Sequence, residues 1–244
     1  MKKLTTVCAL SILGMFSFSA NAAGEKTGLY LNGKAGVSVL QLSGQSQNFS
    51  YADDHEKYNS GSSRDTVFTG GIALGYDFSS NFDIPVRAEI EFSSRGKSHT
   101  GYNLEKESSD NFSSRWDAKT QLSLNTAMVN AYYDFKNQSA FTPFISAGLG
   151  YARVHQKTTL TDIYSEQDFN DVTSSSRSGT SNNFAWSLGA GVKYALTSNV
   201  NVDLSYRYLD AGKTEVSSAT EDEDYKSKAS VKTNDITLGV TYSF

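Results

Sequence analysis

FAWSLGAGVKYAL, residues 184–196, alternates large apolar side chains with small or polar ones at every second position. A period of two, sustained over thirteen residues, indicates a β-strand whose two faces meet different environments. The same alternation recurs, less perfectly in places, in seven other segments: 29–39, 68–78, 86–93, 129–135, 145–151, 202–208 and 235–244. The sequence therefore predicts eight strands, each with one apolar face and one polar or small face.

Leu122 and Leu124 interrupt the pattern, because they fall out of phase with the rest of the strand that ends near residue 135. An extra residue in a strand changes which side chains share a face beyond it. We therefore expect a β-bulge or the start of a strand near these two leucines.

The connections between the predicted strands alternate in length. The long ones are 42–64, 98–119, 158–182 and 212–229, and the short ones are 79–83, 136–141 and 197–200. Long loops on one side and tight turns on the other are the arrangement of outer-membrane barrels, with both termini on the periplasmic side. The long connections are rich in Ser, Asn, Asp, Gly and Lys, so we expect them to be solvated and mobile. A soluble sandwich would need its apolar faces to meet and rarely segregates its loops so cleanly. The expected fold is an all-β, eight-stranded antiparallel transmembrane β-barrel with four long extracellular loops.

The first 22 residues are expected to be a cleaved signal peptide. Lys2 and Lys3 precede a short apolar run, and the segment 20–22, Ala-Asn-Ala, offers a small-x-small cleavage site. Residues 23–244 would then form a single barrel domain in the bacterial outer membrane. The only cysteine, Cys8, lies in the segment to be removed, so neither disulfides nor thiol sites are expected in the mature chain.

The charge balance argues against nucleic acid as a partner. The full chain has 22 Lys and Arg against 26 Asp and Glu, and loss of Lys2 and Lys3 leaves 20 against 26, a net charge of −6. Nucleic-acid-binding domains present a basic surface. The partners expected of such a barrel are instead outer-membrane lipid and lipopolysaccharide.

The polar faces of the strands would point into a lumen that the side chains of an eight-stranded barrel can fill. Five positive and six negative residues are expected there: Lys34, Arg87, Arg95, Lys193 and Arg207, with Asp77, Glu89, Glu91, Asp134, Asp203 and Asp235. Buried charges must pair, because an unpaired one is costly. We interpret them as a salt-bridged plug that keeps the barrel closed, rather than as the lining of an ion channel.

Aromatic residues concentrate near the predicted strand ends, as they do at the two interfaces of a membrane barrel. Beyond the apolar band of one strand, Arg153, His155 and Lys157 continue the outward face. A basic rim at this height could meet lipopolysaccharide phosphates. A merely solvated strand end is an equally good interpretation.

Most of the strands resemble those of one enterobacterial group, which comprises the Tia invasion protein, the Hek adhesin and the heat-resistant agglutinins. The segments that carry the resemblance are DTVFTGGIALGYDF (65–78), IPVRAEIEFSSRGK (84–97), NAYYDF (130–135), FTPFISAGLGYARVHQKTT (141–159), NNFAWSLGAGVKY (182–194) and VDLSYRYLDAG (202–212). More distantly, the chain is similar to the opacity proteins. The likeness fades in the long loops. The resemblance of the strands to this group implies adhesion to host-cell glycans or proteins, agglutination, autoaggregation, invasion and binding to sulfated glycosaminoglycans.

The last strand also resembles the signal that the barrel assembly machinery reads. Its alternating residues are Ile236, Leu238, Val240, Tyr242 and Phe244. The resemblance implies that this machinery is a partner during biogenesis.

A glycosaminoglycan site needs clustered Lys and Arg side chains. The second long loop and its base supply the candidates Arg95, Lys97, Lys106, Arg115 and Lys119. Acidic residues are interspersed among them, so the residues themselves support the site only weakly. The acidic run 221–224 in the fourth loop could attract a divalent cation, although a solvated loop tip is the plainer interpretation.

An outer-membrane enzyme would need a histidine beside a nucleophile or carboxylate, oriented by a third group. The three histidines, His55, His99 and His155, show no such arrangement in the sequence. We therefore expect no enzyme activity, cofactor or metal. A passive structural or complement-evading barrel remains the alternative to an adhesin.

Overall fold

The computed structural model describes residues 27–51, 54–60, 62–109, 112–166, 169–219 and 224–244, so the expected signal peptide lies outside the described residues. Within these ranges the chain forms nine strands and one short helix. They are β1 (Leu29–Tyr51), β2 (Asp54–Ser60), β3 (Ser63–Asp77), α1 (Ser79–Phe82), β4 (Val86–Ser109), β5 (Phe112–Asp134), β6 (Phe141–Glu166), β7 (Phe169–Ala195), β8 (Val200–Ala219) and β9 (Asp224–Ser243). None of the described helices is long and apolar enough to cross a membrane.

Eight of the strands close into an antiparallel barrel. Each of β3 to β8 is hydrogen-bonded to the next strand along the chain, β1 pairs with β3, and β1 and β9 pair over most of their length to close the ring. Strand β2 stands apart, because it pairs only with the outer end of β1, Gln45–Tyr51. The prediction of an eight-stranded outer-membrane barrel is confirmed.

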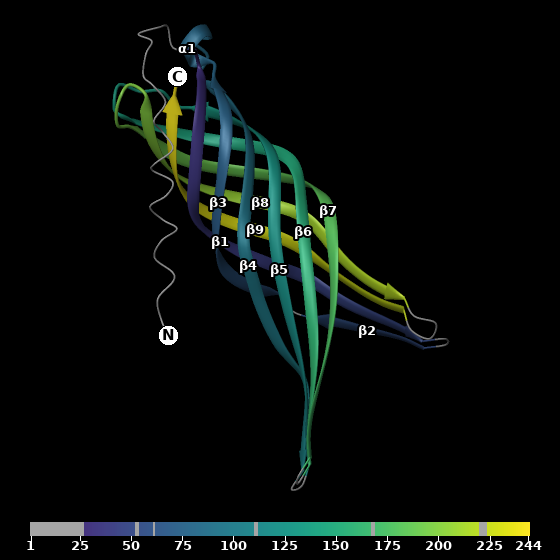
Figure 1. Ribbon diagram of the computed structural model, residues 1–244. Coiled ribbons are helices and arrows are strands. Elements are labelled where there is room, and N and C mark those ends of the chain that lie inside the picture. The colour runs from purple at the N-terminus through teal and green to yellow at the C-terminus, as the bar shows by residue number, and fades with distance from the viewer. Residues whose placement is uncertain (1–26, 52–53, 61, 110–111, 167–168, 220–223) are drawn as a thin grey trace, which may run out of the picture.

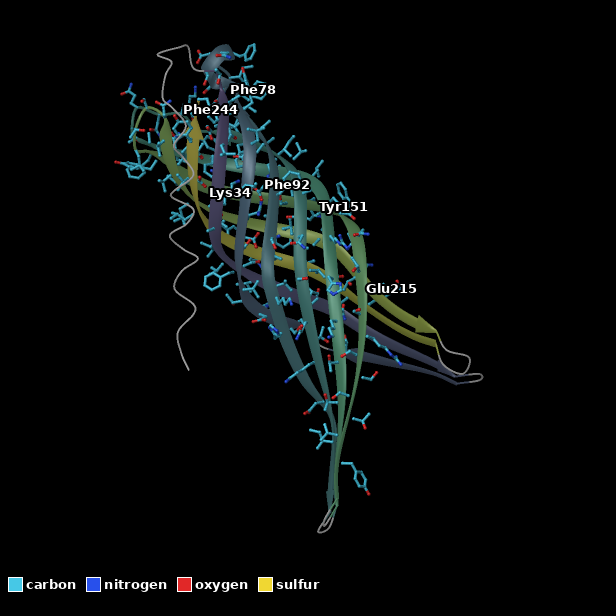
Figure 2. All side chains as sticks on the ribbon, viewed as in Figure 1. Lys34, Phe78, Phe92, Tyr151, Glu215 and Phe244 are labelled. Carbon is cyan, nitrogen blue, oxygen red and sulfur yellow. The ribbon has the colours of Figure 1, made fainter. Side chains whose placement is uncertain are left out.

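The two faces of the barrel wall differ as the alternation predicts. Outward positions carry exposed apolar side chains such as Phe92 on β4 and Tyr151 on β6, while their chain neighbours point into the lumen (Figure 2). An outward apolar band of this kind is what contact with lipid tails requires. Paired aromatic rings lie at the short-turn end, including Tyr133 with Phe135 and Tyr242 with Phe244, whose centroids are 5.1 Å and 5.2 Å apart. These rings suit the periplasmic interface.

The four long connections are present, and most of their described residues are β-strand. Strands β4 and β5 stay paired from Arg87 and Tyr132 out to Ser109 and Phe112, and β6 and β7 stay paired out to Glu166 and Phe169. Polar Ser- and Asn-rich segments can do this because ladder hydrogen bonds come from the backbone. The long connections are therefore mostly hairpin extensions of the barrel strands.

The extensions separate into two arms (Figure 1). Pairing between β3 and β4 stops at Thr69 and Arg95, and pairing between β7 and β8 stops at Trp186 and Asp210. Beyond these points β4 to β7 form one arm, and β1, β2, β8 and β9 form the other.

A bulge lies where the sequence pattern breaks, on the strand beside the leucines. The register of β4 with β5 shifts between Arg95 and Ser98, opposite Leu124 and Leu122. Strand β5 itself keeps its phase, since both leucines share the inward face with buried Met128 and Asn130. They look out of phase in the sequence because the lumen becomes apolar at their level.

Candidate functional site

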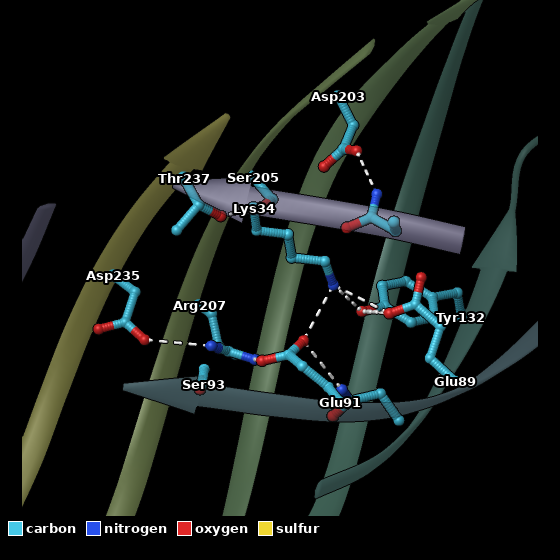
Figure 3. Close-up of polar contacts among 12 residues, drawn as sticks. Lys34, Glu89, Glu91, Ser93, Tyr132, Asp203, Ser205, Arg207, Asp235 and Thr237 are labelled. Carbon is cyan, nitrogen blue, oxygen red and sulfur yellow. Dashed lines mark hydrogen bonds and ion pairs between the residues drawn. The ribbon is translucent and has the colours of Figure 1, made fainter. Parts of the chain in front are cut away.

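The lumen near its middle is organised around Lys34, which β1 holds at an inward position. Its Nζ donates hydrogen bonds of 2.9 Å to Glu89 Oε2, Glu91 Oε2 and the hydroxyl oxygen of Tyr132. The Tyr132 hydroxyl donates in turn to Glu89 Oε2 at 2.8 Å, and that of Tyr30 donates to Glu89 Oε1 at 3.0 Å. One lysine from β1 therefore joins two carboxylates of β4 and a phenol of β5 (Figure 3).

Toward the periplasmic turns the charges continue through Arg87. Its Nε and Nη2 bind the two carboxylate oxygens of Asp134 at 2.8 and 2.9 Å, a bidentate geometry that suits a planar guanidinium. Lys193 of β7 donates to Asp134 Oδ2 at 2.9 Å. The Arg87 guanidinium also lies 3.9 Å from Glu89 and 4.5 Å from the ring centroid of Tyr132. This cluster therefore connects β7, β5 and β4 to the Lys34 centre.

Toward the outer end the charges continue through Arg207 of β8. Its Nη1 donates to Glu91 Oε1 at 2.6 Å, and its Nη2 lies 3.4 Å from Asp235 Oδ2 on β9. Asp235 also receives Arg95 Nη2 at 2.5 Å, and both of these side chains are fully buried. Figure 3 shows Arg207 between the two carboxylates.

These contacts form one continuous chain of alternating sign. Its members in order are Lys193, Asp134, Arg87, Glu89, Lys34, Glu91, Arg207, Asp235 and Arg95. Two of the expected lumen carboxylates lie off this chain. Asp203 accepts a hydrogen bond of 3.3 Å from Asn32, and Asp77 accepts two from Ser79 at the periplasmic turn. Asp203 is thus a partner of Asn32, whereas Arg207 contacts Glu91 and Asp235.

An apolar layer fills the lumen on the outer side of the charges. It is built from twelve buried residues of β1, β5, β6, β7, β8 and β9: Leu40, Leu42, Leu122, Leu124, Met128, Ala152, Val154, Ala185, Leu209, Ala211, Ala229 and Val231. Leu124 and Val154 have no exposed surface. This layer was not expected from the sequence, although the apolar residues at inward positions, such as Leu40 and Leu42, were its signal. An apolar layer above paired charges closes the lumen toward the outside.

The five candidates for a glycan site do not form one patch. Arg95 is buried and its side chain is bound to Asp235 inside the barrel, so it lies apart from the other four candidates. Lys97 and Lys119 are exposed near the base of the β4–β5 hairpin. Lys106 and Arg115 are direct register partners farther out, with side chains outside the described set. Lys119 pairs with Gly101, four positions beyond Lys97 on β4 and four positions before Arg115 on β5, so the cations are spaced along the hairpin in steps of about 13 Å at about 3.3 Å per residue.

The basic rim on β6 lies on the outer surface. Arg153, His155 and Lys157 are all exposed, and they alternate with the buried Ala152, Val154 and Gln156. His155 Nδ1 is 3.0 Å from the Thr180 hydroxyl on β7. A second histidine, His99, lies on β4, and its backbone N–H donates a hydrogen bond to the Asp65 carboxylate at 2.8 Å.

No catalytic arrangement is seen around these histidines. The His155 ring contacts a hydroxyl with no third group in the described contacts, and the His55 side chain lies outside the described residues. Within the described part of the chain, no three His, Cys, Asp or Glu residues are grouped to hold a metal ion. The acidic run 221–224 falls on residues that are not described.

Comparisons with known proteins agree with this architecture. The family model "Outer membrane protein beta-barrel domain" matches residues 8–244. The chain is 37% identical over 253 aligned positions to the Outer membrane protein PagN of Salmonella typhimurium, covering all of both chains. It is 29% identical over 161 positions to a Rickettsia conorii protein named "Putative adhesin", covering 65% of this chain and 59% of that one. Among solved structures, Neisserial surface protein A is 18% identical with a TM-score of 0.48, covering 91% of this chain and 100% of that one.

The relatives with descriptive names are outer-membrane proteins and adhesins, in agreement with a chain that is not an enzyme. The full-length similarity to PagN confirms the resemblance of the strands to the group of Tia and Hek. The full-length matches also agree with an outer-membrane location. The chain belongs to the outer membrane protein β-barrel family, in the group of the Tia and Hek invasins and adhesins.

Proposed function

We propose that the protein is a surface adhesin that attaches the bacterium to host cells and promotes their invasion. The observation that carries the proposal is the pair of strand arms beyond the membrane band. From Arg95 to Ser109 alone, β4 continues for 14 residues, about 46 Å at 3.3 Å per residue. Such arms offer a preformed surface well away from the membrane, where contact with another cell is made.

The closed lumen supports a role on the outer surface. The chain of ion pairs and the apolar layer fill the space through which a solute would pass. A cavity of about 310 Å³ lies at the opposite, periplasmic end, where Lys193 and Asp77 contribute to its walls. Channel activity therefore has less support than adhesion, and so has a passive barrel, which needs no long arms.

We further propose that sulfated glycosaminoglycans contribute to attachment through a row of cations on the β4–β5 hairpin. Lys97 lies near the base, Lys119 lies about 13 Å farther out, and Lys106 and Arg115 pair about 13 Å beyond Lys119, at about 3.3 Å per residue. A linear polyanion can contact cations spread over roughly 26 Å of strand, whereas a compact ligand cannot. Exposed charge contacts of this kind weaken with salt, because the Debye length is about 8 Å at physiological strength. Autoaggregation of cells would follow if the arms also contact other copies.

The test expresses the protein in a non-adherent laboratory strain and counts bacteria attached to cultured epithelial cells. Attachment should appear with the protein and fall with soluble heparin. The variant K97Q/K106Q/R115Q/K119Q removes all four of these cations and leaves the buried Arg95 intact. It should abolish the heparin-sensitive part of attachment.

The matched control is K57Q/K213Q/K226Q/K228Q, which removes four lysines from the other arm. It should keep attachment, with equal surface amounts and heat-modifiable mobility in both variants. If attachment survives heparin and the first variant, the glycan proposal fails and adhesion rests on other contacts. If the wild type confers no attachment to any host cell tested, the adhesin proposal itself is refuted.

A further inference from the structure

Five basic side chains gather on the outward wall of β4, β5 and β6, directly beyond the apolar band. They are Lys97, Lys119, Arg153, His155 and Lys157, which we call the wall patch, and all five are exposed. Lys97 and Lys119 are also part of the proposed glycan site. The three residues of β6 are not part of it.

The register brings the wall patch together. Arg95 pairs with Leu124 and Ser98 with Leu122, so Lys97, in the bulge, falls beside Ser123, and Ser123 is the partner of His155 on the other side. Lys157 pairs with Gln121, two positions from Lys119 on the same face. Diagonal neighbours on one face are about 7–8 Å apart, within reach of long side chains. The basic side chains of the wall patch thus occupy one area on three adjacent strands, with neutral polar residues between them.

The wall patch is not neutralised by acidic residues. In the described part of the chain, no carboxylate forms an ion pair with Lys97, Lys119, Arg153 or Lys157. Asp65 is engaged by the backbone N–H of His99, and Asp117 has a partner of its own. The wall of β8 and β9 differs, because Lys228 lies 3.3 Å from Glu215 and Lys232 lies 3.9 Å from Asp210.

The height of the wall patch relative to the membrane identifies its ligand. Tyr151 and Phe92, which are 47% and 59% exposed, mark the outer end of the apolar band on β6 and β4 (Figure 2). Arg153, His155 and Lys157 follow Tyr151 at successive outward positions, within about 20 Å along the strand at 3.3 Å per residue. That is the level of the phosphorylated headgroups of the outer leaflet, which basic side chains attract.

We propose that the wall patch is a binding site for the phosphate groups of lipopolysaccharide, with Arg153 and Lys157 as its principal ligands. Arg153 can hold two phosphate oxygens with its planar guanidinium, and Lys157 adds a point charge on the same strand face. The acyl chains of the same lipid would lie against Tyr151 and its apolar neighbours. Phosphates above and tails below make a membrane lipid the better fit than a host glycan.

The experiment titrates the purified, folded protein in zwitterionic detergent with fluorescent lipid A that carries both phosphates. The variant is R153Q/K157Q, which leaves Lys97 and Lys119 in place. Loss of two cations should weaken binding about 30-fold, or about 2 kcal/mol at 1.4 kcal/mol per tenfold change. The wild type should bind dephosphorylated lipid A no better than the variant binds the phosphorylated form.

The matched control is K213Q/K228Q, which removes two exposed lysines from the wall of β8 and β9 and should leave lipid binding unchanged. Heat-modifiable mobility checks that all forms are folded. Equal affinity of wild type and R153Q/K157Q for lipid A, or equal wild-type affinity for the two lipid forms, would overturn the proposal. So would a variant that keeps lipid binding but loses heparin-sensitive attachment, since the wall patch would then serve a host glycan. Normal attachment with weakened lipid binding supports the proposal and leaves the adhesin proposal to its own test.

Discussion

Replacement of Arg207 by Leu breaks the charge chain of the lumen near its outer end. It removes the contacts of 2.6 Å to Glu91 and 3.4 Å to Asp235. Removing one partner of a buried ion pair generally costs about 3–5 kcal/mol, because a charge is left uncompensated. Here Glu91 keeps Lys34 and Asp235 keeps Arg95, so we expect about 2–3 kcal/mol, below that range.

The assay is urea unfolding in phosphatidylcholine vesicles, followed by the mobility of unheated samples in electrophoresis. With a slope of about 2 kcal/mol/M, the expected loss lowers the midpoint by about 1 M. Adding E91Q to R207L should recover part of the loss, since a neutral amide needs no counter-charge, and the coupling energy should lie within about 0.5–3 kcal/mol. Lys213→Leu, an exposed site, is the control and should change stability by no more than about 0.5 kcal/mol.

An unchanged midpoint for R207L would refute the interpretation of the charges as a structural plug. A rise in ion conductance at an unchanged midpoint would show instead that Arg207 occupies a conduction path. The same vesicles serve for both measurements, so the two results can be separated.

Three further predictions concern the other layers of the barrel. Leu124→Ala should lower stability by about 3 kcal/mol in the same titration, because it opens a cavity in the apolar layer, while Leu149→Ala on the lipid face should cost clearly less. Epitope tags near Ser62, Ser108 and Ser175 should bind antibody on intact cells and a tag at Ser80 in α1 should not, and labelling at Ser80 would reverse the topology. Deletion of Phe244 should reduce the folded protein in the outer membrane several-fold relative to Phe135→Ala, since its backbone N–H pairs with Leu29 and we propose that the assembly machinery reads the terminal strand. Equal amounts of the two would argue against that signal.

The direction of each lumen side chain could be predicted from the sequence, whereas its partner could not. Lys34 and Arg207 point inward because their strands alternate strictly. The contact of Arg207 with Glu91, 116 positions away, depends on barrel closure and on the register of several strands. Local alternation carries no information about those registers, so the sequence alone cannot select Glu91 from the other inward carboxylates.

The outer half of the molecule was less predictable for two physical reasons. Hydrogen bonds of a hairpin join backbone atoms, so segments such as 172–182 can be strands without any apolar alternation. The inward leucines of the apolar layer, by contrast, break the apparent alternation of the strand. In the sequence, an apolar residue at an inward position cannot be distinguished from a residue that lies on the outward face after a bulge. Both features become visible only when the strands are placed side by side.

The strand arms also change what should be expected of binding at the cell surface. A mobile loop must be ordered when it binds, and that ordering reduces affinity by about 0.5–1.5 kcal/mol for each immobilised side chain. In a paired hairpin the backbone is already ordered before binding, so binding loses little further backbone entropy. The register then decides which residues can act together: Lys106 and Arg115 lie directly across the hairpin, whereas Lys119 lies four positions nearer the barrel. Substitutions of Lys106 and Arg115 should therefore be strongly non-additive, whereas substitution of Lys119 should add to either, because about 13 Å of strand separates it from them.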